Sequence, residues 1–339
     1  MTRFPHYDLH AQDGARTGEP RVPVSSKKTD FFIAGNSKSG TSALYFFLDQ
    51  HPDLCMSSPK EPNLFATDFC HDQDVGAFTR KTLDAYHGFF EDPTESNIWG
   101  EASACYLYST EAARNIHAFN PDAKIIVIFR EPVDFLHSYH LQQLKNPISE
   151  GEVIKDFETA LALEERRKRG ESIPKGCLIP ELLYYSERVR YAEHLARFYA
   201  YFPPSQVKVI IYDDFKRDNE AVYAEILDFL GADTTFRPVF RKHNKGKKLK
   251  SKTAQRVMHQ LSHGEGQWSG VHKLLTTLFP KSMRQFLVQK VFETVVFKPK
   301  DKVPPALRSR LMAQYKPDVE QFSALIGRDL VAEWHYDAV

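Results

Sequence analysis

The chain has 339 residues, of which 42% are hydrophobic and 13% aromatic, so it can bury one large core. Its formal net charge of +1 excludes the strongly basic composition of many nucleic-acid and membrane-surface proteins, and any basic site must be local. The four cysteines show no CxxC spacing and are too few to cross-link a chain of this length, which indicates reduced thiols in a reducing compartment.

The start of the chain differs in composition from the rest. Residues 1–28 are rich in Arg, Pro, Ser and Lys and lack the apolar core of a signal peptide, so we expect a flexible polar arm. No apolar run reaches the roughly 18 residues that a membrane-spanning helix needs. These features predict a soluble, cytoplasmic protein. Residues 29–339 are expected to form a single domain with a basic, helical C-terminal flank from about residue 250.

Apolar runs and helical patterns alternate along the chain. Strands are expected at 30–34, 54–57, 124–129 and 207–212. Helices are expected at 41–50, 132–144, 154–169, 180–201, 219–230 and 305–326. This alternation predicts an α/β, P-loop-like three-layer fold, in which a central parallel sheet carries helices on both faces.

The first strand leads into the segment FFIAGNSKSGTS, residues 31–42. Gly35 and Gly40 have the spacing of a nucleotide triphosphatase P-loop, in which a lysine follows the second glycine. Here Thr41 stands at that position, and Lys38 lies inside the loop. The backbone N–H groups of Thr41 and Ser42 open a helix whose positive end favours an anion. The pattern predicts a phosphate cradle with a displaced cation, although a plain strand-to-helix turn would also fit this segment alone.

The second motif is KIIVIFREPVDFLHSYH, residues 124–140. Its strand places Arg130 at the carboxyl end, where ligands of open α/β sheets bind. Pro132 starts the next helix and Ser138 follows two turns into it. A planar guanidinium beside a hydroxyl suits a phosphate monoester, and an arginine paired with a nearby carboxylate is the alternative.

The third motif, RKHNKGKKLKSK at residues 241–252, surrounds one glycine with lysines. Gly246, flanked by Lys245 and Lys247, can bring backbone amides close to a phosphate. A solvated basic face is the alternative interpretation.

Together these motifs resemble the sulfotransferases that use 3'-phosphoadenosine 5'-phosphosulfate (PAPS), over roughly residues 30–335. That family holds the 5'-phosphosulfate in a PKSGT-like loop and the 3'-phosphate with an RxPxxxxxSxY element, and NKGKK is similar to its KGRK loop over the nucleotide. The resemblance implies that the donor is bound by Lys38, Ser39, Gly40, Thr41, Ser42, Arg130, Ser138, Lys245, Gly246 and Lys247. Tyr191 aligns with a family tyrosine near the adenine.

KEPNLF at 60–65 is similar to the KExxFF stretch of the heparan-type enzymes and their bacterial relatives, which implies that Glu61 is the catalytic base. GEASACYLYS at 100–109 resembles a segment of bacterial members. The chain departs from these relatives at Phe135, where many carry a second arginine, at Asn63, where heparan-type enzymes have a histidine, and at Ala102, where they have a lysine. A polysaccharide acceptor is therefore not carried over.

The resemblance implies in-line transfer of a sulfuryl group from PAPS to a hydroxyl or amine of a carbohydrate, lipid or small-molecule acceptor, with PAP as the product. Lys38 would stabilise charge on the leaving phosphate, and Glu61 would accept the proton of the acceptor. Lysine, helix amides and arginine can offset the charge of the donor, so we expect no metal. No nucleic-acid partner is expected.

Two other classes fit parts of the sequence. A P-loop small-molecule kinase would share the strand, loop and helix, but it needs a lysine at position 41 and an aspartate that holds magnesium. A non-catalytic nucleotide-binding protein would be expected to have lost Lys38 or Glu61, and both are present.

Overall fold

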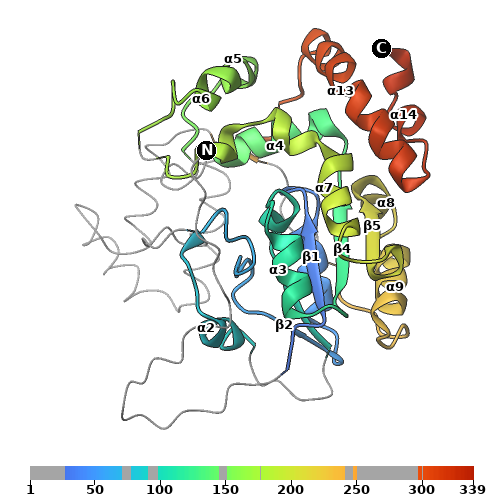
Figure 1. The fold of residues 1–339 in the computed structure, drawn as a ribbon. Coiled ribbons are helices and arrows are strands. Elements are labelled where there is room, and N and C mark those ends of the chain that lie inside the picture. Colours follow the sequence, from blue (N-terminus) through green and yellow to red (C-terminus); the bar gives the residue numbers. More distant parts are fainter. Residues whose placement is uncertain are drawn as a thin grey trace, which may run out of the picture.

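The computed structural model describes residues 27–70, 78–90, 98–144, 151–175, 177–240, 247–249, 297–299 and 301–339. A five-stranded sheet of order β2-β3-β1-β4-β5 forms its centre (Figure 1). The strands are β1 (Phe31–Gly35), β2 (Leu54–Met56), β3 (Ile98–Ala102), β4 (Lys124–Phe129) and β5 (Val207–Ile211). All neighbouring strands are parallel, so their carboxyl ends meet at one edge.

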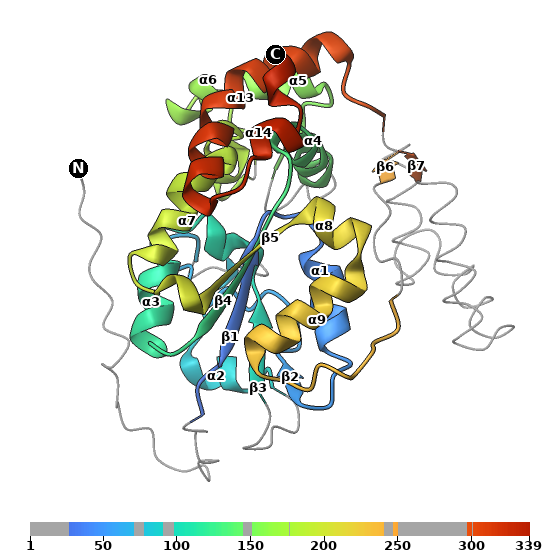
Figure 2. The same ribbon diagram turned by 90° about the vertical axis from the view of Figure 1, so that its right-hand side faces the viewer.

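Strand β1 and, after its first residue, strand β4 are apolar because both faces of the sheet are covered. Within β1, Phe31 and Ile33 belong to one buried cluster, whereas Phe32 and Ala34 belong to the other. Figure 2 shows the two covering layers, with α3 and α7 on one side of the sheet and α1, α8 and α9 on the other. These helices are α1 (Thr41–Leu48), α3 (Ala112–Phe119), α7 (Tyr191–Tyr199), α8 (Tyr212–Arg217) and α9 (Asn219–Leu230). The predicted three-layer α/β fold is confirmed.

The C-terminal helices pack beside the carboxyl end of the sheet. They are α13 (Pro305–Ile326), α14 (Leu330–Glu333) and the 3-10 helix η7 (Tyr336–Ala338). In both ribbon views α13 lies next to α7 and to α4 (Pro132–Gln143), with which it makes contacts (Figures 1 and 2). Phe322 of α13 contacts Phe129 of β4, with ring centroids 4.5 Å apart. Helix α13 is thus part of the core.

Shorter elements complete the described part of the chain. They are α2 (Leu83–His87), η2 (Ala104–Leu107), α5 (Phe157–Ala162), α6 (Glu164–Lys168), η3 (Pro180–Leu183), η4 (Ser186–Val189), η5 (Pro204–Gln206) and a two-stranded pair of β6 (Lys247–Leu249) with β7 (Phe297–Pro299). Among the helices that the structure describes, none has the length and apolar character to span a bilayer.

Several predicted elements need correction. The single helix expected at 180–201 is instead η3, η4 and α7, because the backbone leaves helical geometry at Tyr184 and Arg190. The helix expected at 154–169 starts at Phe157 and is divided into α5 and α6. The helix expected at 305–326 is confirmed with those bounds. Apart from Lys27 and Lys28, the predicted N-terminal arm lies outside the described residues, as do residues 250–296 of the flank.

Strand β3 was not expected, because its sequence IWGEA contains a glycine and a glutamate, which strands disfavour. Both residues have reasons in the packing. A Cβ atom at Gly100 would lie 2.0 Å from the ring of Phe31, so only glycine fits there. Glu101 is fully buried.

Candidate active site

The loop between β1 and α1 makes a tight turn at the carboxyl edge of the sheet. Gly35 and Gly40 have φ angles of 154° and 91°. A Cβ atom at Gly35 would lie 2.8 Å from the backbone oxygen of Ile128 on β4. At Gly40 it would lie 3.0 Å from the ring of Phe215. The two glycines are therefore needed both for backbone conformation and for close packing.

Polar groups of this loop suit an anion. Gly40 is the N-cap of α1 and offers no side chain, so the first N–H groups of that helix have no side-chain cap. Ser39 is fully buried, and its Oγ has no hydrogen-bond partner among the described residues. The same holds for Oδ1 of Asn36. Open helix amides beside buried polar atoms fit the phosphosulfate group that the sequence predicts here.

Arg130, at the end of β4, contacts this loop directly. Its Nη1 donates a hydrogen bond to the backbone carbonyl of Lys38 at 2.9 Å. Its guanidinium lies 4.8 Å from the ring centroid of Tyr212, and its Nη2 is 3.9 Å from the carboxylate of Asp134. The ion pair to Asp134 is at the outer limit of contact, so the guanidinium is not neutralised by a close carboxylate there. The structure thus brings the first two sequence motifs together.

The segment after Arg130 is fixed by the C-terminal elements. Glu131 caps α4 by accepting hydrogen bonds from the backbone N–H groups of Val133 and Asp134. The same carboxylate accepts a hydrogen bond from Arg308 of α13 at 3.1 Å and one from the hydroxyl of Tyr336 at 2.6 Å. Sequence reasoning missed Glu131, although a glutamate directly before a helix-starting proline is a capping signal.

Ser138 and Tyr191 are both buried. Ser138 lies on α4, as expected. The hydroxyl of Tyr191 donates to the backbone carbonyl of Arg130 at 2.7 Å, and its ring packs against Phe129 with centroids 5.0 Å apart. Tyr191 therefore supports Arg130 from within the core. A contact of either side chain with the donor stays a prediction.

Lys38 lies among other charged groups. Burial lowers the pKa of Lys38, nearby Arg130 and Lys60 lower it further, and Glu61 opposes this shift. Burial of this ammonium and, to a smaller extent, repulsion by the neighbouring cations disfavour its charged form when no anion is bound. A polyanionic ligand would relieve this repulsion.

Glu61 follows β2 and is held at the end of β3. Its backbone N–H donates to the carbonyl of Ala102 at 3.0 Å, and its own φ is 65°. Its carboxylate Oε1 is 2.7 Å from Nζ of Lys60, and the side chain is 44% exposed. The loop continues through Asn63, whose N–H donates to Oγ of Ser103 at 3.1 Å. Attachment to the unpredicted strand β3 therefore places Glu61 at the same edge as Lys38.

A cavity of about 40 Å³ lies between α4 and the loop that joins β1 to α1, which we call the phosphate loop. Its lining includes Ser37 and Glu61, as well as Tyr108, Tyr139 and Arg188. One wall of this cavity comes from the phosphate loop, and another carries Glu61, the predicted base.

Tyr108 and Arg188 are site residues that the sequence reasoning did not assign. The hydroxyl of Tyr108 accepts a hydrogen bond from the backbone N–H of Ser37 at 3.3 Å and one from Nδ2 of Asn36 at 3.4 Å. Burial raises the pKa of Tyr108 to about 12, so this hydroxyl is neutral. Its place in the GEASACYLYS motif was a usable signal. Arg188 had none, because it lay in a stretch that read as one continuous helix.

The third motif remains largely unplaced. Lys245 and Gly246 lie outside the described residues. Lys247 begins β6, opposite Pro299 of β7. A contact of these residues with the nucleotide stays a prediction.

Comparison with known proteins agrees with this geometry. The bifunctional heparan sulfate N-deacetylase/N-sulfotransferase 3 of Homo sapiens is 30% identical over 207 residues, which are 59% of this chain and 22% of that protein. The bifunctional heparan sulfate N-deacetylase/N-sulfotransferase 2 of Bos taurus is 31% identical over 206 residues, which are again 59% of this chain and 22% of that protein. The chain thus matches about a fifth of the length of these relatives.

A crystal structure of a sulfotransferase from Alicyclobacillus acidocaldarius superposes with a TM-score of 0.64 at 27% identity, covering 90% of this chain and 98% of that one. The pattern of the sulfotransferase domain matches residues 28–275, which is most of the chain. The protein therefore belongs to the sulfotransferase family.

Proposed function

We propose that the protein transfers a sulfuryl group from PAPS to a hydroxyl or amine of an acceptor, with Glu61 as the general base. The observation that carries this proposal is the meeting of four charged groups at one edge of the sheet. Arg130 is hydrogen-bonded to the backbone of Lys38, and Lys38 is close enough to Arg130, Lys60 and Glu61 for their charges to affect its pKa. The site thus holds cations that can stabilise a leaving phosphate and a carboxylate that can accept a proton.

The donor would be held by the phosphate loop and the end of β4. The N–H groups of Thr41 and Ser42 and the buried Oγ of Ser39 would face the phosphosulfate, and Arg130 with Ser138 would hold the 3'-phosphate. PAPS supplies an activated sulfuryl group when bound. The protein contributes fixed positive charge where negative charge builds on the leaving phosphate, and Lys38 is the residue placed for this role.

Glu61 would accept the proton of the attacking hydroxyl or amine. Its carboxylate borders the cavity and is partly open to solvent, so a proton acceptor and a route for the acceptor coincide. Lys60, 2.7 Å away, orients this carboxylate. With Lys38, Arg130 and helix amides around the donor, we propose that transfer proceeds without a metal.

The acceptor class is proposed more broadly than the donor. The names of the heparan sulfate relatives suggest a carbohydrate as the acceptor. A lipid with a hydroxyl group or a small molecule is also compatible with the family. All four cysteines are free, which supports our proposal of a reducing compartment such as the cytoplasm. Thr41 in the first turn of α1 argues against the kinase alternative, and Glu61 beside the cavity argues against a protein without catalysis.

The test is transfer itself. The protein would be incubated with PAPS, a chelator and separate acceptors, including amino sugars, neutral and acidic sugars, phenols and alcohols. Mass spectrometry would detect sulfated products, and release of PAP would be measured in parallel. We expect sulfated product with at least one class, and Lys38→Met should abolish it. Tight PAP binding with no product from any class would instead support the non-catalytic alternative.

A further inference from the structure

Arg188, in η4, is a buried cation with no ion-pair partner among the residues that the structure describes. Its residue is 3% exposed, and its guanidinium stacks 4.2 Å from the ring centroid of Tyr108. Nη2 donates to the backbone carbonyl of Glu181 at 2.9 Å, which is a neutral acceptor. Nε and Nη1 have no hydrogen-bond partner among the residues that the structure describes. Buried charges are normally paired, so these N–H groups require an explanation.

Arg188 lines the same cavity as Glu61 and as Ser37 of the phosphate loop. A second buried polar group lines it, because Gln143 of α4 has an Oε1 atom without a hydrogen-bond partner in the described part of the chain. The volume of about 40 Å³ has room for one group of roughly the size of a water molecule or a carboxylate. The lining of this cavity thus combines N–H donors of Arg188 and an amide oxygen of Gln143 that have no hydrogen-bond partner among the described residues.

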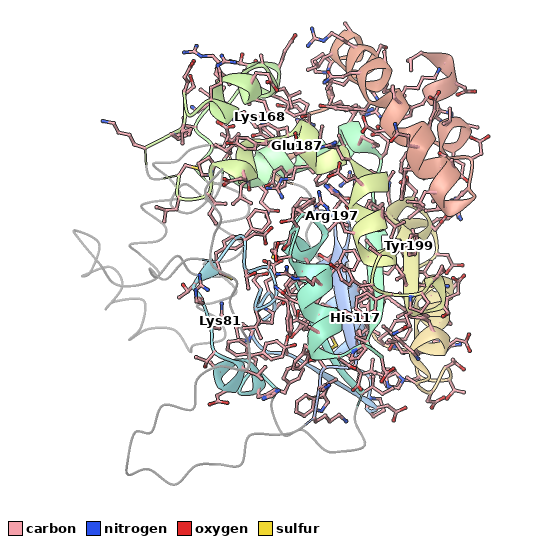
Figure 3. The ribbon with its side chains drawn as sticks, viewed as in Figure 1. Lys81, His117, Lys168, Glu187, Arg197 and Tyr199 are labelled. Carbon is pink, nitrogen blue, oxygen red and sulfur yellow. The ribbon has the colours of Figure 1, made fainter. Side chains whose placement is uncertain are left out.

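The position of Arg188 is fixed by its neighbours rather than by a carboxylate of its own. Ser186 donates its backbone N–H to Glu164 at 2.8 Å, and Nζ of Lys168 lies 2.9 Å from the carboxylate of Glu187. Figure 3 shows Lys168 and Glu187 together where α6 meets the segment before α7. Residues next to Arg188 therefore anchor η4 through their own contacts, and Arg188 lines the cavity.

We propose that Arg188 binds an oxyanion carried by the acceptor, a carboxylate or a sulfate, so that the preferred acceptors are acidic molecules. This inference rests on the proposed sulfotransferase function and specifies its substrate. The guanidinium fork matches a planar or tetrahedral oxyanion, and the rings of Tyr108 and Tyr139 hold it in place. The anionic group alone would occupy the cavity, and the rest of the acceptor would lie outside it, beside the partly exposed carboxylate of Glu61.

The first experiment compares matched acceptors that differ in one anionic group. The pairs are para-hydroxyphenylacetate with para-hydroxyphenylacetamide, and para-nitrophenyl glucuronide with para-nitrophenyl xyloside. We expect kcat/KM for transfer from PAPS to be roughly ten- to a hundredfold higher for the acid in each pair that reacts. Equal values within a reacting pair, or a preference for the neutral member, would overturn the proposal while leaving the sulfotransferase function intact.

Variants assign the preference to this residue. Arg188→Gln should remove the preference for the acid, so that kcat/KM falls much more for the acid than for its neutral partner, whereas Arg188→Lys should keep part of the preference. Arg190→Gln is the matched control, because Arg190 is an exposed arginine that pairs with Glu187 and Glu193. If Arg188→Gln slows both members of a pair equally, the residue has only a structural role.

Direct binding keeps the test decisive if no acceptor in the pairs reacts or Arg188→Gln does not fold. In NMR spectra, the Nε–H resonance of Arg188 would be assigned as the signal that is missing from Arg188→Lys. This resonance would then be followed in the wild-type protein during titration with sodium acetate and, separately, with sodium sulfate. Each titration would be done with and without PAP. We expect a saturable shift with at least one anion, and the comparison identifies which. No shift with either anion would overturn the subsite. Failure of PAP to bind would instead count against the proposed function.

Discussion

The Nη1 atom of Arg130 donates a hydrogen bond to the backbone carbonyl of Lys38 at 2.9 Å, which joins the end of β4 to the middle of the phosphate loop. Behind this contact, the carbonyl of Arg130 accepts from Tyr191 and the carboxylate of Glu131 accepts from Tyr336. The C-terminal helices therefore help to set the loop that carries Lys38. Arg130 therefore contributes both positive charge and a hydrogen bond that helps to fix the conformation of the phosphate loop.

Arg130→Ala should weaken binding of PAP by roughly ten- to a hundredfold, because it removes a charged hydrogen-bond donor and the support of the loop. Arg130→Lys should recover only part, since an ammonium lacks the fork of a guanidinium. Calorimetric titration with PAP measures both. Arg114→Ala, which removes an arginine paired on the surface of α3 with Glu111, is the control and should bind like the wild type. Unchanged affinity in Arg130→Ala would refute its role at the donor.

Affinity for PAP should fall with rising pH. Burial, Arg130 and Lys60 lower the pKa of Lys38, so this ammonium loses its proton below the usual value of 10.5. Because an anion binds the protonated form better, binding takes up a proton and is strongest below that pKa. Titrations between about pH 7 and pH 10 would show the decrease. In Lys38→Met the pH dependence should be much flatter, and an equally steep dependence in this variant would assign the titration to another group.

Glu61→Gln should lower kcat by about 10² to 10⁴, because the amide cannot accept the proton of the acceptor. Affinity for PAP should remain close to that of the wild type. Steady-state kinetics with a confirmed acceptor and calorimetry with PAP separate the two effects. Glu165→Gln, at an exposed position on α6, serves as the control for loss of a surface carboxylate. Full activity of Glu61→Gln would show that another group is the base.

Glu101→Gln should stabilise the fold increasingly as pH rises. Burial raises the pKa of Glu101 to about 8 from its usual 4.5, so the folded protein keeps the neutral acid over a range in which the unfolded chain ionises. The stability from this difference is complete below pH 4.5 and is lost as pH rises to about 8. Urea unfolding of both proteins across this range measures it. Parallel stability curves would exclude ionisation of Glu101 as a cause.

The positions of the phosphate loop and of Arg130 in the fold could be predicted from the sequence, because the features that set them are local. The spacing of Gly35 and Gly40 requires a tight turn, and a strand that ends at Arg130 must deliver that side chain to the carboxyl edge of a parallel sheet. The meeting of Lys38 with Arg130 follows from these two facts. The C-terminal helix from Pro305 to Ile326 was equally predictable, since proline starts it and Gly327, with φ of 66°, ends it.

The acceptor side depends on contacts between distant residues, which local patterns do not reveal. Strand β3 contains Gly100 and Glu101, and only the ring of Phe31 and the surrounding core explain them. Arg188 looked like one polar residue of a long helix, but its guanidinium is buried against Tyr108, which is far away in the sequence. A buried charge cannot be recognised until the rings that cover it are known.

We propose that this edge of the sheet binds PAPS as a donor without a metal. The most direct measurement is calorimetric titration of the wild-type protein with PAP in the presence of EDTA and, separately, with ATP and magnesium chloride. We expect tight, saturable binding of PAP that is unaffected by the chelator, and much weaker binding of ATP. Binding of ATP with magnesium and none of PAP would contradict the account and favour a kinase.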